Sequence, residues 1–65
     1  MACNTKPNIA SPDDFYAALV QMYDGLDDAA CMRANARLIL LLANHVGDER
    51  VLREAVDLAA RPENC

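Results

Sequence analysis

Hydrophobic positions recur at helical spacing in three stretches of the chain. The first stretch carries Phe15, Leu19 and Met22 three to four residues apart. It opens on Ser11, followed by a proline and two aspartates, an order typical of a helix N-terminus. Gly25 favours the end of a helix because it adopts left-handed backbone at little cost. The pattern predicts a helix from about residue 12 to about residue 24.

Two further helices follow after short connections. Asp28 opens the second helix, which we expect to run to about His45 and to end at Gly47. Asp48 caps the third helix, which closes at residues 61–62. No segment alternates with a period of two, so we expect no sheet. The sequence predicts an all-α fold, a compact three-helix bundle whose neighbouring helices run roughly antiparallel because their connections are short.

The length of the chain limits its organisation to one small domain. Residues 1–10 show no period and contain Pro7, so they are predicted to form a flexible N-terminal arm. Residues 11–65 are predicted to form a single helical domain. Such a short chain buries only about 60% of the surface that its unfolded form exposes. The longest unbroken apolar run, residues 38–43, is far too short to span a membrane, so we expect no membrane partner.

The second predicted helix carries apolar side chains in every direction. Residues 38–42 are five consecutive aliphatic residues, which a helix distributes around its whole circumference. A helix that is hydrophobic all round is typical of a buried helix. The two other helices are thin and rich in alanine, which accounts for 12 residues of the chain. We therefore expect part of this surface to need a cover that a monomer does not provide.

Asn35 interrupts a seam of coiled-coil type on the second predicted helix. Cys31, Asn35, Leu38, Leu42 and His45 are spaced 4, 3, 4 and 3 residues apart. A single Asn in such a seam lowers stability but fixes register and partner number, so this pattern favours a twofold homodimer. The alternative is that Asn35 bonds a carbonyl group of another helix inside one monomer. A homodimer would also stabilise so small a domain.

The predicted interaction surface combines these apolar positions with two arginines. Burial of the leucine run would supply the attraction, and the arginines, one helical turn apart, would form ion pairs. An alternative is that the two arginines belong to a solvated face. The predicted residues are Arg33, Asn35, Arg37, Leu38, Leu40 and Leu42.

Charge and cysteine content exclude several classes of function. Six basic against ten acidic residues give a net charge of -4, which disfavours binding to nucleic acid. The three cysteines are widely spaced, and no secretory signal opens the chain, so we expect free thiols in a reducing cytoplasm. No paired zinc ligands of the CxxC type occur and His45 is the single histidine, so we expect no metal site, and we expect no cofactor.

Arg37, Asn44 and His45 form the alternative site, one for a small molecule or an anion. The guanidinium would bind the charge, and Asn44 and His45 would shape a polar notch between the second and third helices. The simpler interpretation is that His45 interacts with carbonyl groups at the end of its helix. The chain has no nucleophile–base pair and little bulk to enclose a substrate, so we expect no enzyme.

Three stretches of the sequence resemble a known family. They are PDDFYAAL at residues 12–19, Gly25-Leu26, and NARLILLLANHVGD at residues 35–48, the most specific of the three. Together they resemble domain-of-unknown-function family 2783, small helical proteins found mainly in proteobacteria. Met22 departs from the family pattern, in which a polar residue is expected nearby.

The resemblance implies a bacterial protein without assigned catalytic residues. Genes of that family often lie near flavin-dependent oxidoreductases of aromatic breakdown, which implies a helper role beside such an enzyme. Together with the residues, this favours a non-catalytic protein-interaction module. Its partner would be a second copy of the chain or a larger bacterial protein.

Overall fold

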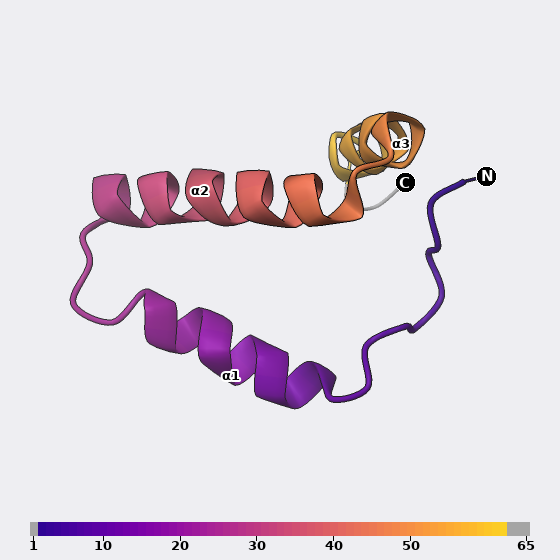
Figure 1. Ribbon diagram of the computed structural model, residues 1–65. Coiled ribbons are helices and arrows are strands. Elements are labelled where there is room, and N and C mark those ends of the chain that lie inside the picture. The colour runs from indigo at the N-terminus through magenta and orange to yellow at the C-terminus, as the bar shows by residue number, and fades with distance from the viewer. Residues whose placement is uncertain (1, 63–65) are drawn as a thin grey trace.

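Three α-helices joined by short turns make up the part of the chain that the computed structural model describes, residues 2–62 (Figure 1). They are α1 (Pro12–Met22), α2 (Asp28–Val46) and α3 (Glu49–Ala59). Within residues 2–62 there is no strand. The predicted all-α, three-helix architecture is confirmed. The last three residues of the predicted domain lie outside the described part of the chain.

Both ends of α2 are fixed by residues that the sequence marks as helix boundaries. The Oδ1 atom of Asp27 accepts a hydrogen bond of 2.8 Å from the amide of Ala30. At the other end, Gly47 adopts left-handed backbone with φ 73°, and its amide donates to the carbonyl oxygen of Ala43 at 2.9 Å. These contacts satisfy backbone groups that a helix terminus leaves without partners. The helix ends at Val46, one residue beyond the predicted end.

The caps of the two shorter helices differ in strength. Asp48 caps α3 as predicted, and its Oδ1 atom accepts from two amides of the first turn at 3.0 and 3.4 Å. Ser11 occupies the N-cap position of α1, but its side chain makes no capping hydrogen bond. The prediction that Gly25 ends α1 is wrong, because Tyr23 is the C-cap. Gly25 instead takes a positive φ of 77° in the following turn.

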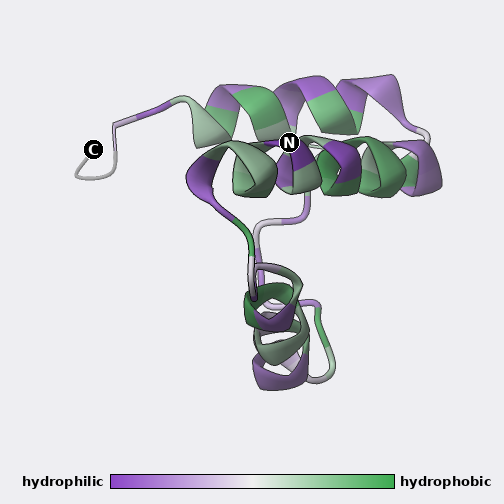
Figure 2. Cartoon of the chain, turned by 90° about the vertical axis from the view of Figure 1, so that its left-hand side faces the viewer, coloured by the Kyte–Doolittle hydropathy of each residue, from purple (hydrophilic) through white to green (hydrophobic). Residues whose placement is uncertain are grey.

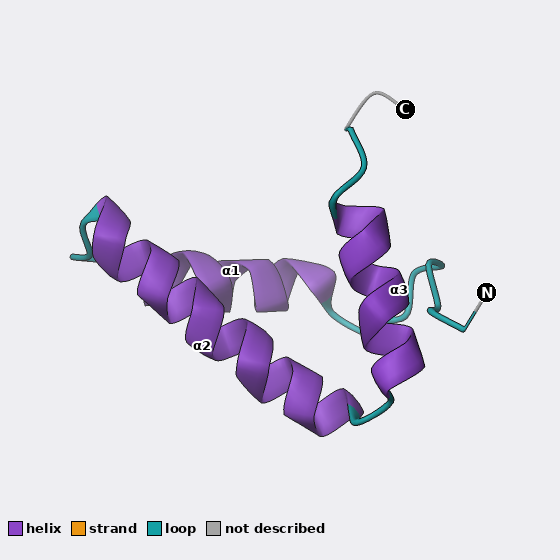
Figure 3. Ribbon diagram, turned by 90° about the horizontal axis from the view of Figure 1, so that it is seen from above, coloured by secondary structure: helices purple, strands orange, loops and turns teal. Residues whose placement is uncertain are grey.

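The helices reverse direction at each turn but diverge from one another. Figures 1 and 3 show that α1 and α2 lie closest at the turn joining them and separate away from it. The radius of gyration is 13.5 Å, whereas about 11 Å is typical of a compact domain of this length. Figure 2 shows that α3, the helix before the C-terminus, carries both hydrophobic and hydrophilic residues along its length. The arrangement leaves much apolar surface open.

The small core of the molecule lies where α1 meets the first half of α2. Ala34 of α2, 6% exposed, is the one buried residue between positions 2 and 62. Because α1 diverges, it covers only the N-terminal half of the face that Ala34 occupies. The half-buried residues around Ala34 come from α1, its C-cap and α2: Leu19, Met22, Tyr23, Ala30, Cys31, Asn35 and Leu38.

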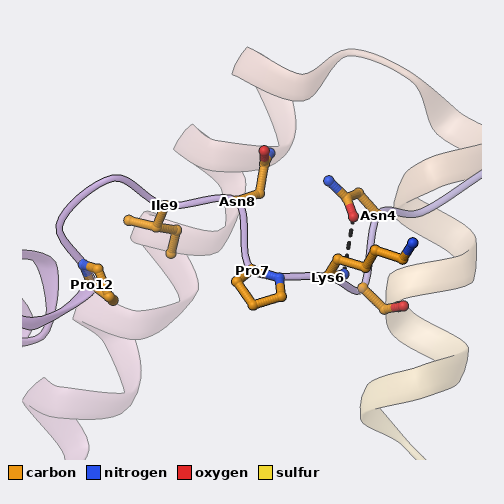
Figure 4. Close-up of a pocket in the computed structure, with 7 residues that line it drawn as sticks. Asn4, Lys6, Pro7, Asn8, Ile9 and Pro12 are labelled. Carbon is orange, nitrogen blue, oxygen red and sulfur yellow. Dashed lines mark hydrogen bonds between the residues drawn. The ribbon is translucent and has the colours of Figure 1, made fainter.

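The N-terminal arm runs from α1 towards α3 and is held there by one carboxylate. The amides of Ala2 and Cys3 donate to Oε2 of Glu54 at 2.8 and 3.2 Å. Figure 4 shows the middle of the arm, where Asn4 accepts a 3.0 Å hydrogen bond from the amide of Lys6. Described residues 2–10 contain no helix or strand. The contact with α3 was not predicted.

Candidate interaction surface

Large apolar side chains are exposed on two sides of α2. Leu40 and Leu41 are each 69% exposed, and Met32 and Ile39 are 72% and 64% exposed. Successive residues of a helix are rotated by about 100°, so Ile39 and Leu40 project in different directions. Neither side is covered by α1 or α3. Both sides are candidates for contact with another molecule.

The first of these sides combines leucines with polar and basic side chains. We call it the leucine–arginine face, and it comprises Arg33, Arg37, Leu40, Leu41 and Asn44. A shallow groove in it is lined by the last four of these residues. A second groove, towards the α1–α2 turn, shares Arg37 and Leu41 and is walled mainly by apolar side chains. The face therefore offers apolar contact beside a guanidinium group.

Neither arginine of this face forms an ion pair with another residue of the described range 2–62. Within residues 2–62 the one ion pair joins Arg53 and Glu49, at 3.8 Å along α3. Arg33 and Arg37 are both exposed. An exposed guanidinium can bind a carboxylate through two parallel hydrogen bonds. This leaves both arginines available to a binding partner.

Asn35 makes its hydrogen bond inside the single chain. The hydroxyl of Tyr23 donates to Oδ1 of Asn35 at 2.6 Å, joining the end of α1 to α2. The structure thus shows the intramonomer alternative for Asn35, although with a tyrosine hydroxyl as partner instead of a backbone carbonyl. The sequence pattern does not predict this pair, because a tyrosine at the edge of a core is common and does not indicate which residue its hydroxyl contacts.

The predicted seam is divided by the way α1 folds back. Its first part, Cys31 to Leu38, lies half-buried against α1, whereas Leu42 and His45 are exposed. Leu38, predicted to contact a partner, faces α1 in the chain itself. Helical periodicity places these residues along one line of the helix but cannot show which element covers that line. The seam is therefore not one continuous open surface.

The structure brings together two of the three residues of the alternative ligand site. Arg37 and Asn44 line the same groove, with the side chains of Leu40 and Leu41 beside them. His45 is exposed in the last turn of α2 and does not line that groove. The reason is the helical rotation of about 100° between Asn44 and its neighbour. An anion in this groove would meet Arg37 and Asn44.

Other chemistry is sparse in the described part of the chain. Cys3 and Cys31 are free thiols, and Cys65 lies outside the described residues. Between residues 2 and 62, no three His, Cys, Asp or Glu side chains lie close enough together to bind a metal ion. In the same range, none of the helices combines the length and the apolar character that crossing a membrane requires.

Comparison with known proteins gives one match, which covers almost the whole chain. The sequence model of a family described as "Protein of unknown function (DUF2783)" matches residues 3–61. No curated protein and no solved structure matches the chain. The match includes all three helices and most of the arm, so the surfaces of α2 lie within it.

Proposed function

Since the chain belongs to the DUF2783 family, whose description states no function, we propose from its surface that it is a non-catalytic protein-interaction module. It acts in the bacterial cytoplasm as a homodimeric scaffold or as an accessory subunit of a larger enzyme. One observation supports this proposal above all others: α2 exposes most of its aliphatic side chains while the described residues bury little more than Ala34.

The exposed leucines supply the driving force for association. Leu40 and Leu41 keep 69% of their surface in contact with water. Full burial of one such side chain is worth about 1.5–3 kcal/mol. A contiguous exposed apolar patch rimmed by polar groups is a frequent mark of a protein interface. The leucine–arginine face has this composition.

The arginines define the chemistry of a partner for this face. Arg33 and Arg37 lie one turn apart on the side of Leu40. A complementary surface would present apolar side chains flanked by Asp or Glu. The resemblance suggests a flavin-dependent oxidoreductase as the larger enzyme. In an interface of this kind the leucines supply affinity, and the ion pairs supply specificity and speed of encounter.

Substitution of Leu40 tests the proposal. Leu40→Asp places a charge in the centre of the leucine–arginine face, and we expect it to abolish capture of the partner from an extract of the native bacterium. Val56→Asp is the matched control, because Val56 on α3 is 67% exposed and undergoes the same chemical change. The measurements are sedimentation over a wide concentration range and affinity capture with identification by mass spectrometry.

The proposal fails if Leu40→Asp changes neither the oligomeric state nor partner capture. It also fails if Val56→Asp impairs both as strongly as Leu40→Asp does. Circular dichroism of both variants verifies that each retains its helices.

A second candidate function is the binding of a small organic anion by Arg37 and Asn44. It is supported by their position in one groove with two leucines, which would suit a carboxylate attached to an apolar group. Binding would raise the melting temperature with ligand concentration. We expect benzoate to do so and inorganic phosphate not, with the benzoate effect lost in Arg37→Gln. No shift with benzoate would remove this candidate.

A further inference from the structure

The second exposed side of α2 carries a regular heptad pattern. Five residues define what we call the heptad stripe, spaced 3, 4, 3 and 4 residues apart: Met32, Asn35, Ile39, Leu42 and Val46. Four of the five are exposed: Met32 and Ile39 by 72% and 64%, and Leu42 and Val46 by 48% and 50%. Asn35 is half-buried, and its Oδ1 atom accepts the hydrogen bond from Tyr23. This spacing keeps one line of side chains facing a parallel or antiparallel partner helix. The stripe runs along almost the entire length of α2.

The edges of the heptad stripe allow another helix to approach closely. Ala36 and Ala43 flank it on one side, and small side chains at these positions let two helix axes come together. The other flank consists of Cys31 and Leu38, which are half-buried against α1, and of exposed His45. Neither flank carries an Asp, Glu, Lys or Arg. Two copies of the chain, each with a net charge of -4, could therefore meet here without like charges at the contact.

We propose that a second copy of this chain packs antiparallel on the heptad stripe. The inference rests on the proposed function, since it names the partner of one surface of the same interaction module. The two surfaces of α2 then have separate occupants. The heptad stripe binds a second copy, and the leucine–arginine face stays open to a larger protein.

The distribution of charge along α2 selects the antiparallel orientation. Asp27 and Asp28 lie at the start of the helix, and Asp28 continues the heptad spacing four residues before Met32. A parallel pair would place these carboxylates opposite their counterparts and align the two helix dipoles, both of which are unfavourable. An antiparallel pair keeps the two acidic ends apart and opposes the two helix dipoles, both of which are favourable.

A twofold axis in this arrangement passes near the level of Leu40 and Leu41. Ile39 then packs against Leu42 of the second copy, and the same contact recurs on the other side of the axis. The rise of 1.5 Å per residue places the two copies of residue 39 about 5 Å apart along the axis, but the two copies of residue 32 about 25 Å apart. The orientation can therefore be read from crosslinking.

Sedimentation of two neighbouring variants tests the contact itself. The wild-type chain should be a dimer under reducing conditions, Ile39→Asp should be a monomer, and Leu40→Asp should remain a dimer. The two substitutions are chemically alike and lie on adjacent residues, so each controls for the other. A monomeric wild-type chain, a dimeric Ile39→Asp variant or a monomeric Leu40→Asp variant would each overturn the proposal.

Single introduced cysteines test the orientation. In a background with Cys3, Cys31 and Cys65 replaced by serine, Ile39→Cys should be joined by a short bismaleimide and Met32→Cys should not. Crosslinking at both positions would show a parallel pair and overturn the antiparallel assignment. Sedimentation of the serine background should show a dimer, so that a missing crosslink reports on geometry.

This inference and the proposed function fail in different ways. If the wild-type chain is a monomer that captures a larger protein through Leu40, the second copy is excluded and the interaction module stands. If the chain dimerises through Ile39 but Leu40→Asp alters nothing, self-association stands and the leucine–arginine face loses its assigned role.

Discussion

Tyr23 connects the end of α1 to α2 through a single hydroxyl group. Its 2.6 Å bond to Asn35 is half-buried, and such a bond contributes about 0.5–1.5 kcal/mol to stability. We expect Tyr23→Phe to lower the free energy of unfolding by that amount in urea denaturation. Tyr16→Phe is the control, because Tyr16 is 66% exposed, and it should leave stability unchanged. Equal stability of the two variants would show that the bond contributes nothing.

The caps of α1 and α3 predict different losses of stability for two similar substitutions. Asp48 accepts from two backbone amides, whereas the side chain of Ser11 accepts from none. Asp48→Ala should lower the free energy of unfolding by about 0.5–2 kcal/mol, the usual value of an N-cap. Ser11→Ala should change it little. Thermal denaturation followed by circular dichroism measures both, and a larger loss for Ser11→Ala would contradict the cap assignment.

At the scale of the elements, the arm depends on one residue of α3. Glu54 accepts from the amides of both Ala2 and Cys3. Glu54→Ala should therefore release the arm, and we expect the heteronuclear NOE values of residues 2–5 to fall. Asp57→Ala, at an exposed position of the same helix, should leave them unchanged. An arm whose NOE values are low in the wild-type chain would refute the contact.

The sequence was informative about the helices and uninformative about how they pack. The limits of α2 could be predicted because Asp27 and Gly47 act through hydrogen bonds within their own turns. The face of α2 that α1 covers could not, because aliphatic residues surround that helix and its periodicity has no single direction. For the same reason the seam through Leu38 was predicted as open surface although α1 covers its first part. The bond between Tyr23 and Asn35 depends on the angle between two helices, which no local pattern encodes.

At the scale of the whole molecule, the open arrangement is the feature that relates structure to role. A radius of gyration of 13.5 Å and a single buried residue within positions 2–62 describe three helices that share little interior. A 65-residue chain has few means of compensating for so small a core, and oligomerisation is one of them. The exposed apolar surface that lowers the stability of the isolated chain is the same surface that would bind it to another molecule.

The stability of the molecule should consequently depend on its concentration. If folding is coupled to dimerisation through the heptad stripe, mass action stabilises the folded state by about 1.4 kcal/mol per dimer for each tenfold rise in protein concentration. With an unfolding entropy of about 2.1 cal/mol/K per residue, two 65-residue chains should gain about 5 °C in melting temperature per tenfold.

Ile39→Asp should melt at a lower temperature than the wild-type chain, because its α2 surfaces can no longer pair. For the same reason its melting temperature should not depend on protein concentration. Val56→Asp should keep this dependence, since that residue lies on α3, away from the heptad stripe. Scanning calorimetry over two decades of concentration measures both. A wild-type melting temperature that stays constant across this range would mean that each chain folds alone, and the exposed surface of α2 would then serve only a different protein.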